Sequence, residues 1–470
     1  MWNNSLILMK QELMVTLLIF ILLFIKISSA DGKNERILRF VNLLLFVNLL
    51  SGFFFQSEGN LFSGMFHSSR LISLEKNMLN LGTLIISLQS YDWLNKNDHV
   101  PEFYVILLTT LLGMFFMISA SNLLIFYLGL ELSTIPLAAL SNFDLGEKKS
   151  SEAAIKLILS SAFSSGLLLF GISLVYGSTG SLDFFEITKQ LDGSALQFFA
   201  FILILSGFGF KISVVPFHLW TADVYEGAPV SIASYLSVIS KGAIFFVFVP
   251  ALYTVFKPLA AHWYQVLILL SVLTMVLGNL FALRQRNMKR LLAFSSIAQV
   301  GFILVGISGS SRAGNASVIY FVLIYIFSNL GAFGVVAIIR ELTGKERLED
   351  YKGLYATNPL LSWTMAIALF SLAGVPPTAG FFGKFFLLMA GAGKGNYAFI
   401  TIAALNMIIS LYYYLQVVKV IFMDSNDHPI EALKIRILPK LGMLICVAGI
   451  FITGLAGWIY DYIYSLSPGF

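Results

Sequence analysis

Apolar stretches of about twenty residues recur along almost the whole chain, and they constrain its fold more than any other feature of the sequence. A helix of that length spans the roughly 30 Å hydrocarbon core of a bilayer. The chain is 58% hydrophobic and only 12% charged, whereas soluble domains contain about 25% charged residues. The sequence therefore predicts an all-α polytopic membrane protein with almost no domain outside the bilayer.

Fourteen of these stretches are long enough to be counted as membrane spans. The third is the least apolar, because Glu75 and Lys76 lie within it. Residues 13–27 are similar to a signal-peptide core, but no small-residue cleavage site with the usual polar shoulder follows, so we expect an uncleaved first span. The predicted spans are residues 6–27, 37–55, 71–90, 103–121, 123–143, 152–176, 196–222, 229–255, 262–283, 290–308, 315–340, 358–391, 397–423 and 438–464.

The loops between the spans differ in positive charge. The odd-numbered loops, with the span ends beside them, hold eighteen Lys and Arg residues, whereas the even-numbered loops hold five. The first loop and the span end beside it contain Lys33, Arg36 and Arg39. Because basic loops stay on the cytoplasmic side of a membrane, this asymmetry places both termini on the outer, periplasmic face.

Two spans contain helix breakers beside a lysine. The seventh reads SGFGFKISVVPFHLW, in which Lys211 precedes Pro216. The twelfth reads SLAGVPPTAGFFGKFF, in which Pro376 and Pro377 precede Lys384. A helix break at membrane depth is tolerated only where protein or water satisfies the freed backbone groups. Ion carriers often combine such breaks with charged residues.

The two broken spans are five spans apart, which suggests an internal repeat. We interpret spans 4–8 and 9–13 as two five-helix repeats, which an odd number of spans forces into inverted orientations. This interpretation divides the chain into N-terminal helices 1–3 (residues 1–100), a first repeat (101–260), a second repeat (261–425) and a C-terminal helix 14 (426–470).

Five ionisable residues stand out inside the spans, where a charge costs roughly 3 kcal/mol at the helix centre. Because such residues normally face water or a partner charge, we interpret them as a path for protons. His218, just past the first break, is a further candidate because histidine titrates near neutral pH. The five residues are Glu131, Lys156, Lys211, Lys241 and Lys384.

These residues also have structural interpretations. Lys156 lies about one turn from a span end, so its amine can extend to the interface. Glu131 and Lys211 can form a buried ion pair that only holds helices together. On the other hand, Ser234, Ser237 and Lys241 share one helix face, and small hydroxyls can hold water for a relay. They also permit close helix packing.

We expect a Glu131–Lys211 pair to work as a switch. A Glu–Lys pair about 4 Å apart is worth roughly 4 kcal/mol at an effective dielectric constant near 20. Moving one charge against a membrane potential of about 100 mV costs about 2.3 kcal/mol. The energy of one ion pair is therefore large enough to drive the transfer of one proton. The proposed path runs from Lys211 through Lys241 to Lys384 and then outward.

The chain lacks the residues that a redox centre needs. Its one cysteine, Cys446, excludes a four-thiolate cluster and an intrachain disulfide. The five histidines show no haem or metal spacing: they are His67, His99, His218, His262 and His428. We therefore expect no cofactor and no metal in this chain.

Five segments resemble the antiporter-like membrane subunits of respiratory complex I, the NADH-quinone oxidoreductase. The resemblance implies a translocase subunit of the bacterial inner membrane, in which partner subunits hold NADH, FMN, iron–sulfur clusters and quinone. The implied partners are other membrane-arm subunits, including antiporter-like sister subunits, and the lipid bilayer, with no nucleic acid. The segments are GFGFKISVVPFHLWTADVYEGAPVS, YLGLELSTIPLAAL, SEAAIKLILSSAFSSGLLLFGISLVYGSTGSL, MKRLLAFSSIAQVGFILVG and LAGVPPTAGFFGKFFLL.

The resemblance also implies roles for single residues. Glu131 and Lys211 match the charge pair of the family, and Lys384 matches its exit-side lysine. Lys156 and Lys241 match its connecting lysines. The sequence departs from the family at Gln299, in SSIAQVG, where relatives often carry histidine. A relay through this position would then depend on water.

Three other functions remain open at this stage. The first is a subunit of a multisubunit cation/proton antiporter or of a membrane-bound hydrogenase complex, which shares the broken helices and lysines. The second is a secondary transporter that works alone on a small solute. The third is a scaffold whose buried charges only lock helices together.

Overall fold

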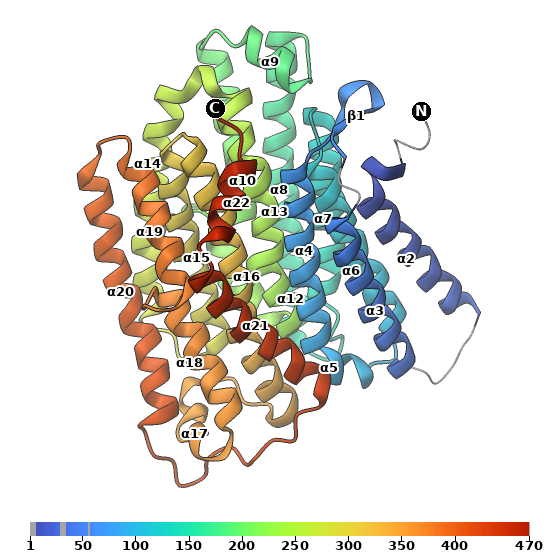
Figure 1. The fold of residues 1–470 in the computed structure, drawn as a ribbon, viewed down its shortest axis with the longest axis vertical. Helices are drawn as coiled ribbons and strands as arrows, with labels where there is room; N and C mark the ends of the chain where they lie inside the picture. Colours follow the sequence, from blue (N-terminus) through green and yellow to red (C-terminus); the bar gives the residue numbers. More distant parts are fainter. Residues whose placement is uncertain (1–5, 29–33, 55–56, 470) are drawn as a thin grey trace.

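The computed structural model describes residues 6–28, 34–54 and 57–469. Its helices stand side by side in one bundle (Figure 1). Among these residues, eleven helices are long and apolar enough to cross a membrane. The predicted all-α polytopic class is therefore confirmed. Lys33 and Phe55, the end of the second predicted span, lie outside the described residues.

Every one of the fourteen predicted spans contains a helix. Three predicted spans are not among the eleven helices. The first and third spans, α2 and α4, carry charged side chains, and the twelfth span is divided into two short helices, α18 and α19. The exact number of spans stays a prediction. The first part of the chain comprises α2 (Lys10–Ile27), α3 (Asn34–Phe53), β1 (Gly59–Leu61), β2 (Phe66–Ser68), α4 (Arg70–Gln89) and α5 (Tyr91–Asn95).

The central part of the chain contains the first broken helix. Its elements are α6 (Val100–Ile118), α7 (Leu123–Ser141), α8 (Lys148–Thr179), α9 (Phe184–Gln190), α10 (Ala195–Ile212), α11 (Leu219–Gly227), α12 (Val230–Ser234) and α13 (Lys241–Pro250). A π-helical turn, Tyr235–Ser240, joins α12 to α13. Such turns occur frequently at functional sites.

The last part contains the second broken helix. Its elements are α14 (Ala260–Ala282), α15 (Met288–Ser308), α16 (Arg312–Thr343), α17 (Leu354–Thr357), α18 (Pro359–Ala373), α19 (Ala379–Ala392), α20 (Tyr397–Phe422), α21 (Ile437–Leu455) and α22 (Trp458–Leu466). The beginning of α2 and the end of α22 lie at one end of the bundle with β1 and α9, and α5 and α17 lie at the other (Figure 1). These two ends are called the β1 end and the α5 end below.

The first predicted break separates α10 from α11. Ser213 ends α10 in the left-handed conformation, with a φ of 65°. The side chains of other residues then satisfy the freed backbone groups: the Val215 amide donates to Thr274 Oγ1 at 3.1 Å, and Trp220 Nε1 donates to the Phe210 carbonyl at 3.2 Å. The break is therefore stable because protein groups replace the missing helical hydrogen bonds.

The second predicted break separates α18 from α19, and here the lysine itself satisfies the backbone. Gly374 ends α18 with a φ of 88°, a conformation that glycine adopts without strain. Lys384 Nζ donates to the carbonyls of Leu372 at 2.7 Å and Ala373 at 3.3 Å. The ammonium thus binds the exposed carbonyl end of the broken helix, where a positive charge is favourable.

The helix pairs correspond between the two halves of the chain. The broken pair α10 and α11 packs along the long helix α8, and the broken pair α18 and α19 packs along the long helix α16. Similarly, α6 packs along α7, and α14 packs along α15. This correspondence agrees with the hypothesis of two five-helix repeats.

Candidate functional site

Lys211 lies at the end of α10 and is surrounded by hydroxyl groups. Its side chain is buried, and its Nζ donates to Thr134 Oγ1 at 2.9 Å and to Ser161 Oγ at 2.7 Å. Glu131, one turn before Thr134 on α7, accepts a hydrogen bond from Ser165 Oγ at 2.5 Å. Ser161 and Ser165 are one turn apart on α8, so the amine and the carboxylate each bond to a hydroxyl of that helix.

The direct Glu131–Lys211 ion pair that we expected is not formed among the described residues. The lysine bonds to Thr134 and Ser161, and the carboxylate bonds to Ser165. Hydroxyl groups both donate and accept hydrogen bonds, so each charged group bonds to hydroxyls instead of to the other charge. The predicted switch stays a prediction.

Lys241 begins α13, directly after the π-helical turn. Its side chain is only 2% exposed, and its Nζ donates to Ser296 Oγ on α15 at 2.8 Å. The same nitrogen lies 5.7 Å from the centre of the Tyr225 ring, within the range of a cation–π interaction. Lys241 therefore connects the α11–α13 segment to the second half of the bundle.

A second line of hydrogen bonds begins at Ser295, the residue before Ser296, and leads toward Lys384. Ser295 contacts the Tyr414 hydroxyl. Gln299 Nε2, on the next turn of α15, donates to the same hydroxyl at 3.1 Å and to the Leu372 carbonyl at 3.0 Å. Lys384 Nζ binds that carbonyl as well. Gln299 thus lies between the two lysines.

We expect this position to tolerate histidine but no apolar residue. Gln299→His should keep proton-coupled turnover within about twofold of wild type, because an imidazole can both donate and accept at the same place. Gln299→Leu should lower it about tenfold, since leucine interrupts the line. Coupled turnover in membrane vesicles measures both variants, and equal turnover in Gln299→Leu and wild type would show that the line is not used.

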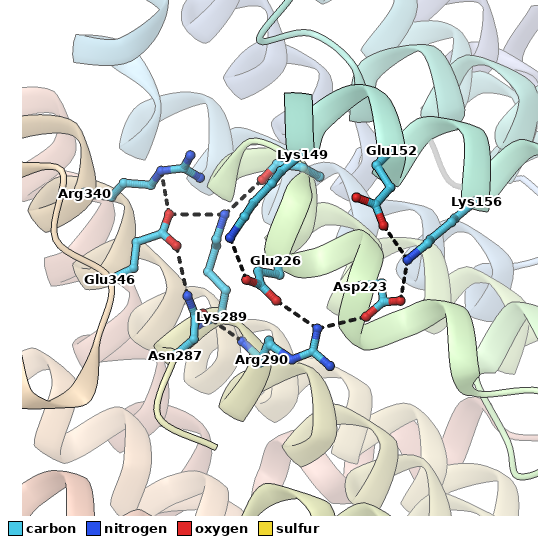
Figure 2. Close-up of polar contacts among 11 residues, drawn as sticks. Lys149, Glu152, Lys156, Asp223, Glu226, Asn287, Lys289, Arg290, Arg340 and Glu346 are labelled. Carbon is cyan, nitrogen blue, oxygen red and sulfur yellow. Dashed lines mark hydrogen bonds and ion pairs between the residues drawn. The ribbon is translucent and has the colours of Figure 1, made fainter. Parts of the chain in front are cut away.

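Lys156 lies apart from this line, in a cluster of charged residues at the α5 end of the bundle. Its side chain is 40% exposed, and its Nζ pairs with Glu152 at 2.6 Å and with Asp223 at 2.7 Å (Figure 2). This position agrees with an amine that extends to the interface. The predicted role of Lys156 in proton transfer stays a prediction.

Asp223 and Glu226 of α11 are shared between two helices (Figure 2). Arg290, on α15, lies 2.8 Å from an oxygen of each carboxylate. Lys149, on α8, pairs with the other oxygen of Glu226 at 3.0 Å. We refer to these four residues, with Glu152 and Lys156, as the α11 charge cluster. It holds the half-helix that follows the first break.

A second group of charges continues from the α11 charge cluster. Glu346 accepts from Arg340 at 2.7 Å and from Asn287 at 3.0 Å, and it pairs with Lys289 at 3.3 Å (Figure 2). Lys289 also donates to the carbonyl of Ala228, the residue after α11. We did not predict this group or the α11 charge cluster. The sequence did contain a signal for these charge clusters: Asp223 and Glu226 follow the first break closely, and the odd-numbered loops are basic.

His218 is buried beside the first break but has no role that the contacts define. Its ring stacks on Phe281 with 6.5 Å between ring centres. Neither ring nitrogen has a hydrogen-bond partner among the described residues. Its proposed part in proton transfer stays a prediction.

A cavity of about 370 Å³ opens at the α5 end of the bundle. Ser90 and Ser231 line it, and the Ser90 hydroxyl donates to that of Ser231 at 2.6 Å. Asp144, in the loop before α8, also lines it and accepts from Trp93 Nε1 at 3.2 Å. Burial raises the pKa of Asp144. Ser231 begins the helical face that carries Ser234, Ser237 and Lys241.

No group of three or more His, Cys, Asp and Glu residues that could hold a metal is present within residues 6–28, 34–54 and 57–469. Cys446 is buried.

Comparisons with known proteins also identify the chain as similar to membrane proteins. The model of a family described as NADH:quinone oxidoreductase/Mrp antiporter, transmembrane, matches residues 120–410. A relative from Phocaeicola vulgatus, named NADH-quinone oxidoreductase subunit N, is 45% identical and covers 96% of this chain and 97% of its own.

Two solved structures are similar over nearly the whole chain. A chain of respiratory complex I from Thermus thermophilus with bound aureothin has a TM-score of 0.82 and 27% identity, covering 96% of this chain and 98% of its own. A chain of the Mrp complex from Dietzia sp. DQ12-45-1b has a TM-score of 0.86 and 20% identity, with coverages of 97% and 96%. The second likeness shows a shared fold.

Proposed function

Because the chain belongs to the NADH:quinone oxidoreductase/Mrp antiporter transmembrane family, we propose that it is a proton-translocating membrane subunit of an NADH-quinone oxidoreductase. It corresponds to the subunit that is named N in its relatives. The observation that carries this proposal is the set of buried polar contacts at two lysines. Lys241 bonds to Ser296, and Lys384 shares the Leu372 carbonyl with Gln299, which also bonds to Tyr414.

The transfer begins at Lys211 and Glu131. The ammonium keeps its proton by bonding to Thr134 and Ser161. When the carboxylate approaches, the proton is held more tightly, and when it withdraws, the amine releases the proton more readily. Lys241 is the next acceptor and Lys384 the last. Water joins the lysines where side-chain contacts do not.

The redox chemistry belongs to other subunits in this proposal. NADH, FMN, iron–sulfur clusters and quinone bind there, and electron transfer drives the proton path through the membrane arm. Antiporter-like sister subunits are the proposed neighbours of this chain. The proposed location is the bacterial inner membrane, with both termini on the periplasmic face, because the basic odd-numbered loops belong on the cytoplasmic side.

The proposed division of the chain follows the repeats. Residues 1–100 hold the N-terminal helices, residues 101–260 the first repeat, residues 261–425 the second repeat and residues 426–470 the C-terminal helix. Lys211 belongs to the first repeat and Lys384 to the second. Each repeat then supplies one broken helix with its lysine.

A subunit of a multisubunit cation/proton antiporter is the second candidate function, because the Mrp complex shares the fold.

Purification of the complex that contains this chain distinguishes the two candidate functions. We expect the intact complex, isolated through this chain, to contain flavin and iron–sulfur proteins and to acidify or alkalinise proteoliposomes when NADH is oxidised. An isolated complex without redox subunits, which instead exchanges Na⁺ for protons, would overturn the proposal in favour of the antiporter.

A further inference from the structure

A second buried ion pair lies outside the lysine line, among the N-terminal helices. Glu12 of α2 and Lys76 of α4 are 2.5 Å apart, and their side chains are 2% and 1% exposed. Beside them, Gln11 Nε2 donates to Asn77 Oδ1 at 2.6 Å. None of these residues takes part in the transfer described above.

Several acceptors around this pair have no donor among the described residues. They are Glu12 Oε2, Asn48 Oδ1 and Asn80 Oδ1. The amide of Asn80 donates to the Leu45 carbonyl at 3.0 Å, so α3 and α4 meet here, and Asn48 is three residues beyond Leu45 on α3. Buried acceptors without donors are unfavourable, and ordered water commonly fills such polar sites.

A row of polar side chains leads away from the pair along one face of α4. The row consists of Lys76, Asn80, Thr83, Ser87 and Ser90, spaced alternately four and three residues apart, and all are buried. This spacing places them on one side of a helix.

The row reaches the opposite end of the bundle. Ser87 Oγ lies 2.6 Å from the Tyr104 hydroxyl. Ser90 bonds to Ser231 and lines the cavity of about 370 Å³ at the α5 end. A polar row thus connects this cavity to the ion pair, which lies toward the β1 end.

We propose that Glu12 and Lys76 form a second, hydrated proton-exchange site, reached from the α5-end cavity along α4. Its ligand is water. The ammonium of Lys76 gives one proton to the carboxylate of Glu12, which leaves a neutral amine and a neutral carboxylic acid, or passes it to water in the row. Only N–H and O–H bonds break and form. The site lies outside the lysine line and goes beyond the proposed function.

Other charged groups surround the pair. Lys10 of α2 and His67 of β2 both interact electrostatically with Lys76, as does its neighbour Glu75. α2 and α4 also pack against α3 and α6, and α4 packs against α5, α12, α13, α16, α21 and α22. The charged residues of these helices are Glu35, Arg36 and Arg39 of α3, Asp92 of α5, Glu102 of α6, Lys241 of α13, Arg312, Arg340 and Glu341 of α16, Lys440 of α21 and Asp461 of α22. A proton arriving at the pair therefore meets both acidic and basic neighbours.

Infrared difference spectroscopy of the purified intact complex tests the proposal. A change of pH should produce a carboxylic acid band that Glu12→Gln removes. Glu75→Gln should leave this band in place, because Glu75 is a different buried carboxyl, on α4 beside Lys76. Lys211→Ala should also leave it in place, although that variant is expected to lose pumping. The Glu12 band therefore tests the second site, whereas pumping in Lys211→Ala tests the proposed function, and either result can be negative without the other.

Further variants guard against misfolding and test the route. Glu12→Gln alone leaves Lys76 without a counter-charge, so the double variant Glu12→Gln with Lys76→Met keeps the volume without charge and should also lack the band. Asn80→Leu keeps the ion pair but blocks the row, and should slow hydrogen–deuterium exchange of the band about tenfold. A wild-type spectrum without any Glu12 band would overturn the site, and unchanged exchange in Asn80→Leu would overturn the route.

Discussion

Lys211→Ala is expected to leave an assembled complex in which NADH:quinone turnover and the accompanying proton gradient fall about tenfold or more. The amine is buried and bonds only to hydroxyls in the described contacts, Thr134 and Ser161. A methyl group in its place can neither hold nor release a proton. Glu131→Ala should have an effect in the same direction, because the carboxylate controls how tightly the amine holds its proton.

Lys211→Arg is the matched variant that separates transfer from structure. Arginine keeps the positive charge but does not lose its proton in proteins, so pumping should stay low while assembly on a native gel stays normal. Lys189 forms an exposed ion pair with Glu186, so Lys189→Ala should change neither pumping nor assembly. Normal pumping in Lys211→Arg or in assembled Lys211→Ala would mean that the residue is structural and that the proton path lies elsewhere.

The broken helices could be predicted because their causes are local. Proline removes a helical hydrogen bond and clashes with the preceding turn, and at both breaks prolines and glycines cluster beside a lysine in an apolar stretch. The structure contains both breaks, between α10 and α11 and between α18 and α19. The membrane class followed from the same local property, since stretch length alone fixes whether a helix can cross a bilayer.

The contacts of the lysines could not be predicted in the same way. Helical periodicity tells which side of a helix a residue occupies, but it does not tell which helix faces that side. The sequence therefore suggested a direct Glu131–Lys211 pair, whereas the lysine bonds to hydroxyls of α7 and α8 and the carboxylate bonds to a hydroxyl of α8. The bond from Gln299 to Tyr414 joins positions 115 residues apart, so no local pattern contains it.

Position along a helix suggested where the Lys156 amine lies but not what it does. Lys156 lies near a span end, and the structure places its amine in a half-exposed ion pair with Asp223, while its role in proton transfer stays a prediction. The sequence showed Lys76 only as one of two charges that made the third stretch the least apolar, and it did not single out Glu12. The meaning of the Glu12–Lys76 pair depends on the packing of α2 against α4, which the sequence does not state.

Arg290→Glu is expected to destabilise the complex strongly, because Arg290 joins α15 to both acidic residues of α11. The three side chains are 29%, 38% and 21% exposed for Arg290, Asp223 and Glu226. At such exposure each ion pair is worth about 1 kcal/mol or less. The variant loses two attractions and gains two repulsions, so it should cost about 2–4 kcal/mol, a large part of a typical folding stability of about 5–15 kcal/mol.

Thermal unfolding of the purified complex at low and high salt measures this effect. Because solvent-exposed charges are screened by salt, the difference between Arg290→Glu and wild type should shrink as salt rises. Arg290→Lys keeps the charge but loses the planar guanidinium that serves two carboxylates. Its unfolding temperature should therefore lie between those of wild type and Arg290→Glu. Arg39→Glu reverses a more exposed arginine beside Glu35 and should change little. A loss in Arg290→Glu that salt does not reduce would assign the effect to packing instead of charge.

The same variant connects the α11 charge cluster to transport. Its carboxylates hold the half-helix that follows the break beside Lys211, and Lys149 and Lys156 of α8 hold it from the other side. With Arg290 reversed, the ion pairs of α11 with α8 remain, whereas its two ion pairs with Arg290 of α15 become repulsions. Coupled turnover of the complex that still assembles should then fall severalfold while NADH oxidation by artificial acceptors stays normal, because those acceptors bypass the membrane arm. If coupled turnover instead matches wild type, the cluster fixes the fold but does not position the proton path.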